Sequence, residues 1–151
     1  MVRWLLAAVH LMALGIGLGA IWARARALRG SLDPLGFRRV FYADSWWGIA
    51  AVLWIVTGLV RAFGGLEKGS AYYLHNHIFW GKMALLGLIV LLEAAPMLAL
   101  IRWRIYVRRG QAIDTRLAGR FARISYLQAG LILLMVLAAT GMARGYGAGG
   151  D

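Results

Sequence analysis

The chain contains no cysteine and very few acidic residues. Without cysteine it cannot form a disulfide, a thiolate metal site or a cysteine nucleophile. Only six Asp and Glu residues stand against 17 Lys and Arg residues, which gives a formal net charge of +11. The sequence also lacks a nucleophile elbow, a zinc-binding motif and a phosphate-binding loop, so there is no case for a hydrolase.

Long apolar runs dominate what is present. Hydrophobic residues make up 62% of the 151 residues, whereas a soluble domain is nearer half apolar. A membrane span needs roughly 20 mostly apolar residues, and four runs of that kind use up most of the chain. We therefore predict an all-α, four-transmembrane-helix bundle as a single integral membrane domain, residues 1–151. The expected helices cover about 4–23, 46–61, 77–101 and 124–142.

The ends of these helices carry local signals. Asp44 and Ser45 precede the second run and are typical of a helix N-cap. Pro96 lies inside the third run and is expected to kink that helix, because proline removes one backbone donor.

The positive charge is concentrated between the apolar runs and not on a soluble face, which argues against nucleic-acid binding. Arg24, Arg26 and Arg29 end the first run, and a second basic loop covers residues 102–123. The positive-inside rule places both basic loops in the cytoplasm. Both termini and the loop with His75 and His77 are then expected on the outer, periplasmic side of a bacterial inner membrane, which the chain crosses several times.

Four polar residues are expected at similar depth near the outer side, on three helices: His10, Arg61, His77 and Lys82. Two imidazoles that face each other across a bundle can ligate haem iron axially. We expect His10 and His77 to be the iron ligands, with His75 as the alternative to His77. Arg61 and Lys82 are expected to neutralise the propionates of a haem b.

A simpler interpretation stands beside this one. Histidines at a membrane interface are often only amphipathic anchors, which is the simpler account of His75. His10 differs, because ionisable residues inside spans are rare and usually functional.

A second polar group is expected in the inner half of the bundle, where Glu93, Tyr126 and Gln128 lie in apolar runs. A buried carboxyl group must either be paired or stay protonated. One alternative is a structural hydrogen bond between helices. The other is a proton path or part of a quinone pocket.

Three segments carry a resemblance to a known family: AVHLMALG at 8–15, DSWWGIA at 44–50 and YYLHNHIFWGK at 72–82. They resemble an uncharacterised family of small four-helix bacterial inner-membrane proteins, a domain of unknown function, over nearly the whole chain. The resemblance implies a fold and no settled activity.

More distantly, the chain is similar to HemJ-type protoporphyrinogen oxidases and CopD-like membrane proteins. HemJ-type proteins are haem-b bundles that oxidise protoporphyrinogen IX, and their first span has a histidine that His10 would match. Their later span often shows His-x-Lys. Here the triplet is Trp80-Gly81-Lys82, so the lysine matches and the histidine does not.

The leading hypothesis from the sequence is a b-type haem-binding membrane protein that transfers electrons, with quinone or a porphyrinogen as the redox partner. The alternative is a non-catalytic accessory or structural subunit of a larger membrane complex. Expected partners are the lipid bilayer and either other membrane subunits or further copies of the chain. Whether the protein is an enzyme stays open.

Overall fold

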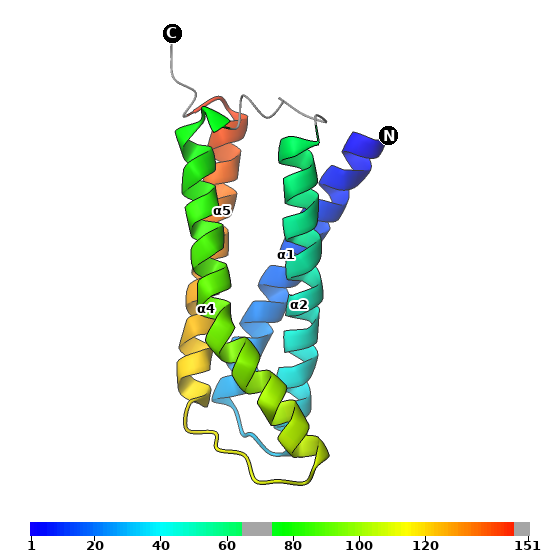
Figure 1. Ribbon diagram of the computed structural model, residues 1–151, viewed down its shortest axis with the longest axis vertical. Coiled ribbons are helices and arrows are strands. Elements are labelled where there is room, and N and C mark those ends of the chain that lie inside the picture. The colour runs from blue at the N-terminus through cyan, green and yellow to red at the C-terminus, as the bar shows by residue number, and fades with distance from the viewer. Residues whose placement is uncertain (65–73, 147–151) are drawn as a thin grey trace.

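The computed structural model describes residues 1–64 and 74–146. In these ranges the chain forms four long helices, α1 (Val2–Arg29), α2 (Pro34–Phe63), α4 (His77–Arg108) and α5 (Ala118–Ala143) (Figure 1). Each is long and apolar enough to cross a membrane. The all-α prediction with four membrane-spanning helices is therefore confirmed. Tyr72 and Tyr73 of the third resemblance segment lie outside the described residues.

The helices begin and end at other residues than predicted, most of all α2. It starts at Pro34 and not near Trp46, because Asp33 provides the N-cap and its carboxylate accepts a 2.7 Å hydrogen bond from the backbone N–H of Gly36. Proline directly after such a cap has the backbone angle that a helix needs and no amide proton to leave unpaired. The predicted cap at Asp44 is wrong, since that residue lies inside α2.

The other helices are extended too. α1 continues beyond residue 23 to Arg29, α4 continues beyond residue 101 to Arg108, and α5 begins at Ala118 and not near residue 124. Arginine is a good helix former, so a basic flank can lengthen a helix instead of ending it. The start of α4 at His77 agrees with the prediction, and Asn76 caps it through a 2.9 Å hydrogen bond from Ile78 N–H.

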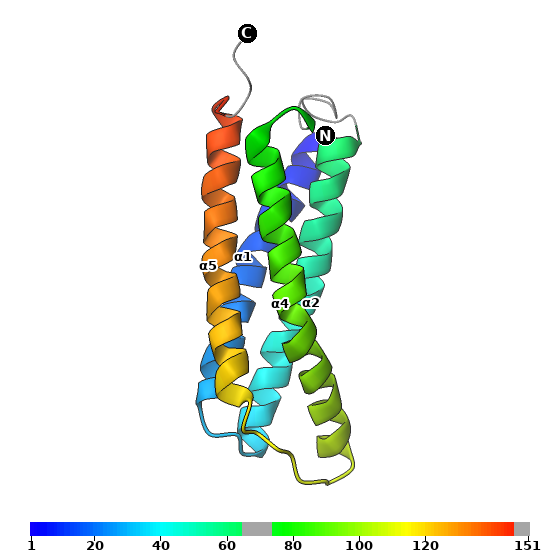
Figure 2. The same cartoon turned by 60° about the vertical axis from the view of Figure 1, so that its left-hand side comes forward.

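The helices pack side by side in the order α2, α1, α5, α4. α1 packs most extensively along α2, and α5 packs along both α1 and α4 (Figures 1 and 2). The start of α1 and the end of α5 lie at one end of the bundle, which we call the terminal end. The connections 30–33 and 109–117 lie at the other, which we call the basic end. Figures 1 and 2 also show α4 changing direction along its length, as expected for a helix with an internal proline, Pro96.

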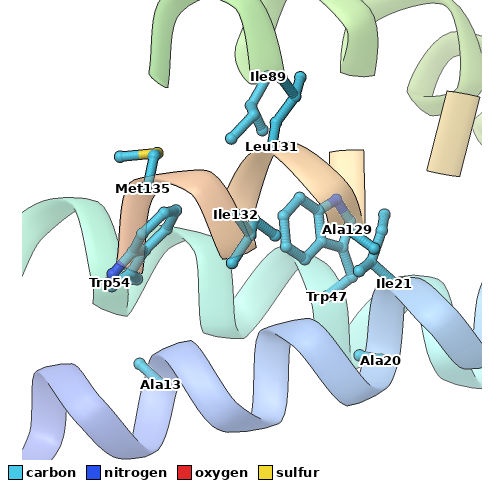
Figure 3. Packing of buried hydrophobic residues seen from close by; sticks show 10 residues of the cluster. All are labelled: Ala13, Ala20, Ile21, Trp47, Trp54, Ile89, Ala129, Leu131, Ile132 and Met135. Carbon is cyan, nitrogen blue, oxygen red and sulfur yellow. The ribbon is translucent and has the colours of Figure 1, made fainter. Parts of the chain in front are cut away.

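The core in the middle of the bundle consists of side chains from all four helices. Trp47 and Trp54 of α2 pack there with Ile89 of α4 and Ile132 of α5 (Figure 3). Gly17 of α1 faces α2 at close range, since a Cβ atom at that position would lie 3.4 Å from the Cβ atom of Ala50. Small residues commonly allow such close approach between membrane helices.

Much of the apolar surface points outward. Val52, Leu91 and Leu137 are 62%, 72% and 67% exposed and lie on three different helices. In water such a surface would be unfavourable, but in a bilayer it contacts lipid tails that are equally apolar. The outward faces of the helices are therefore suited to contact with lipid.

Candidate functional site

A cavity of about 430 Å³ lies near the terminal end, and all four helices contribute to its walls. This volume falls within the range of about 300–1,000 Å³ that is typical of ligand pockets. Three of the predicted site residues line the cavity: His10 from α1, Arg61 from α2 and Lys82 from α4. Most of the other lining residues are apolar. The structure thus brings together one imidazole and two cations in a mainly apolar cavity.

His10 is held against α2. Its Nδ1 atom lies 2.9 Å from the Oγ1 atom of Thr57, and its ring centroid lies 6.1 Å from that of Trp54. A Cβ atom at Gly58 would lie only 3.1 Å from the Cε1 atom of His10, so the absence of a side chain at Gly58 makes room for the ring. Sequence analysis does not single out Thr57 and Gly58, because both residue types are ordinary in a membrane helix.

Three methionines also line the cavity: Met83 of α4, and Met135 and Met142 of α5. Their thioether sulfurs are soft, polarisable groups and belong to the known axial ligands of haem iron. Sequence analysis does not single them out either, since a methionine in an apolar run is usually a core residue.

His75 and His77 lie elsewhere. Both are exposed, and His77 is the first residue of α4. Neither is among the residues that line the cavity. The structure therefore does not bring His77 into the cavity with His10, because the helix reaches the cavity only with Phe79, Lys82 and the residues that follow.

A second polar group lies closer to the basic end, and its centre is Arg24. The side chain is fully buried, and all five of its N–H groups donate hydrogen bonds. Its Nη1 atom donates to Asp44 at 2.9 Å and to Glu93 at 2.6 Å, and its Nη2 atom donates to the second oxygen of Glu93 at 2.8 Å. The remaining donors reach Gln128 Oε1 at 3.2 Å and Ser125 Oγ at 3.1 Å. One arginine therefore connects all four helices.

A second arginine balances the charge of this group. Arg104 donates to the other carboxylate oxygen of Asp44 at 2.8 Å and to the backbone carbonyl of Phe41 at 2.9 Å. Two arginines then stand against two carboxylates. Among the described residues, no buried side-chain nitrogen or oxygen lacks a hydrogen-bond partner. The Arg24 network, which we define as Arg24, Asp44, Glu93, Arg104, Ser125 and Gln128, is thus neutral and fully paired.

The predicted inner group is found in part. Glu93 and Gln128 do meet, since the Nε2 atom of Gln128 donates to Glu93 at 2.9 Å. The grouping of Tyr126 with them must be corrected, because its ring contacts Trp22, with centroids 4.9 Å apart, and Arg29, at 5.1 Å. Two residues along a helix turn a side chain by about 200°, so Tyr126 and Gln128 point to opposite sides of α5.

The structure gives Arg24 and Asp44 other roles than the sequence predicts. The sequence places Arg24 in the basic flank of the first span and Asp44 in a helix cap, yet both are members of the network. The available signal was the occurrence of Glu93 inside a long apolar run, since a carboxylate there requires a cationic or hydrogen-bonding partner.

Comparisons with known proteins agree with a membrane-spanning fold. Neither the curated proteins nor the solved structures gave a match to this chain. The more distant likeness to HemJ-type and CopD-like proteins therefore stays a prediction. Residues 2–147 match the family described as "Predicted membrane protein (DUF2214)", and because the match covers nearly the whole chain, the protein belongs to this family of membrane proteins.

Proposed function

We propose that the protein binds one haem b in the cavity near the terminal end and serves in electron transfer within the membrane. The observation that carries this proposal is the meeting of His10, Arg61 and Lys82 on the walls of one mainly apolar cavity. Haem has matching chemistry, with an apolar ring, a metal that binds imidazole and two carboxylates.

Each of the three polar residues has a distinct part in this proposal. His10 would provide a nitrogen ligand to the haem iron. Arg61 and Lys82 would pair with the propionates through charge-assisted hydrogen bonds, which are stronger than neutral ones. Apolar walls that include Leu14 and Leu86 would contact the ring. When bound, the haem would supply one-electron redox chemistry.

More than one residue of the cavity could provide a second protein ligand to the iron. Met83, Met135 and Met142 line the cavity, and methionine together with histidine is a known ligand pair for haem iron. His77, the ligand favoured from the sequence, lies outside the lining. We therefore propose His10 as the first iron ligand. As the second ligand we favour one of these methionines over His77.

The placement in the cell is also a proposal. The two connections at the basic end favour its location in the cytoplasm by the positive-inside rule, which would put the haem cavity near the outer face of a bacterial inner membrane. A quinone dissolved in the bilayer would then be a suitable redox partner. The outward apolar faces would suit contact with other membrane subunits as well as lipid, which is the basis of the accessory-subunit alternative.

The test is an oxidised-minus-reduced absorption spectrum of the protein purified in detergent, together with a pyridine haemochrome assay. Cells should be grown with ample haem supply. A b-type signal near one haem per chain supports the proposal. A folded protein without any chromophore overturns it and favours the accessory-subunit alternative.

Single histidine variants then test the ligand. His10→Ala should abolish haem binding, whereas His75→Ala and His77→Ala serve as matched controls and should keep it. Loss of haem in His77→Ala would instead favour the ligand pair predicted from the sequence. Full haem content in His10→Ala would exclude His10 as a ligand.

A further inference from the structure

The hydroxyl group of Thr57 has one proton, and the structure indicates where that proton lies. Thr57 is buried, at 6% exposure. Its Oγ1 atom lies 2.6 Å from the backbone oxygen of Leu53 and 3.2 Å from that of Trp54. A backbone oxygen can only accept a hydrogen bond. The hydroxyl therefore donates its proton to the backbone of its own helix, as threonine in a helix commonly does.

This assignment determines the hydrogen bond between Thr57 and His10. The contact of 2.9 Å joins Thr57 Oγ1 to His10 Nδ1. Because the threonine proton is already used, the proton in this bond must come from Nδ1. A neutral imidazole has one N–H and one lone-pair nitrogen, so the lone pair of neutral His10 lies on Nε2.

Gly58 acts on the same ring from the neighbouring position. A Cβ atom there would lie 3.1 Å from Cε1 and 3.7 Å from Nδ1 of His10. The ring thus occupies the space that a side chain at position 58 would need. The hydrogen bond to Thr57 and the space left by Gly58 together fix where the ring lies.

From this geometry we infer that Thr57 is a positioning residue, which fixes the tautomer and the orientation of His10 so that Nε2 is the ligand nitrogen. The inference rests on the proposed function, because it takes haem iron as the group that His10 binds. A hydrogen bond accepted from the second ring nitrogen of a ligating histidine raises the basicity of the ligand. A more basic ligand favours ferric over ferrous iron and so lowers the midpoint potential.

The test replaces Thr57 by valine, which has nearly the same shape and no hydroxyl. Loss of such a partner commonly weakens metal affinity by about 10–100-fold. We expect the dissociation constant for haemin, titrated into haem-free protein, to rise by at least about tenfold. The midpoint potential should rise too, by about 59 mV for each tenfold loss of ferric relative to ferrous affinity.

Two variants serve as controls. Thr115 lies in the connection 109–117 at the basic end and does not line the cavity. Thr115→Val makes the same chemical change away from His10 and should leave the haemin affinity and the midpoint potential as in the unmodified protein. Thr57→Ser keeps the hydroxyl and should restore both values.

Gly58→Ala provides a second route that does not remove a polar group. Alanine has a higher helix propensity than glycine, so Gly58→Ala should fold and tests the inference even if Thr57→Val does not fold. Its methyl group should push the ring away from Thr57 and raise the potential in the same direction. If Thr57→Val binds haem with unchanged affinity and midpoint potential, the inference is overturned but the proposed function stands. If Thr57→Val does not fold, the same result in Gly58→Ala overturns the inference. A folded original protein that binds no haem overturns both.

Discussion

Arg24 of α1 and Glu93 of α4 form a bidentate ion pair inside the bundle, with Nη1–Oε1 at 2.6 Å and Nη2–Oε2 at 2.8 Å. α1 packs mainly along α2 and α5, whereas α4 packs along α5. The ion pair therefore joins two helices whose backbones make little direct contact with each other. It connects them through side chains at a level where an unpaired charge would be costly.

Replacement of Arg24 should reveal how much the Arg24 network contributes to the stability of the folded protein. Arg24→Gln leaves Glu93 and Asp44 without their shared cation, and loss of one partner from a buried ion pair typically costs about 3–5 kcal/mol. We expect a clearly lower thermal unfolding midpoint for the variant in detergent. Arg26→Gln is the matched control, because Arg26 is exposed on the same helix. Equal unfolding midpoints for the two variants would contradict a stabilising role.

Two glycines of α2 should respond in opposite ways to alanine. At Gly36 a Cβ atom would collide with the backbone oxygen of Ser31, while at Gly48 it would meet nothing within 4 Å. Gly48→Ala should stabilise the protein by about 0.5–1 kcal/mol through helix propensity alone. Gly36→Ala should destabilise it, because the turn before α2 must shift. The same unfolding assay measures both, and stabilisation by Gly36→Ala would show that the turn adapts freely.

The two cations of the cavity should contribute to haem affinity. Arg61→Gln and Lys82→Gln each remove a charged donor, and a hydrogen bond to a charged group is worth about 1.5–3 kcal/mol. We expect each variant to bind haemin about tenfold more weakly or worse. Arg3→Gln is the control, since Arg3 lies on α1 and does not line the cavity. Unchanged affinity in both cavity variants would rule out their pairing with propionates.

Part of the geometry at the terminal end can be predicted from the sequence. Counting depth along the apolar runs groups His10, Arg61 and Lys82, and these three residues line one cavity in the structure. Depth counting works there because each residue lies a known number of turns from a helix end. His77 is not among the lining residues, because it is the first residue of α4, and its role as an iron ligand stays a prediction.

The inner network shows what the sequence could not provide. Arg24 lies close to Arg26 and Arg29 in the chain and resembles them in type, yet only Arg24 is buried. Its place depends on Asp44 and Glu93, which are 20 and 69 residues away. Such distant pairing is a property of the assembled helices. The start of α2 was missed for a local reason, because Asp33-Pro34 is a signal both for a turn and for a helix N-terminus.

The charges of the Arg24 network also bear on how the chain enters the membrane during synthesis. An isolated charge at the centre of an inserting helix costs about 2.5–3.5 kcal/mol. Arg24 and Asp44 belong to consecutive helices and bind each other, so the first hairpin can neutralise its own arginine before the later helices are made. When α4 follows, Glu93 can pair with Arg24, which is already in the membrane. α5 then adds the last two hydrogen-bond partners, Ser125 and Gln128. We expect biogenesis to follow the order of the chain, with each new segment completing the pairing left by the one before.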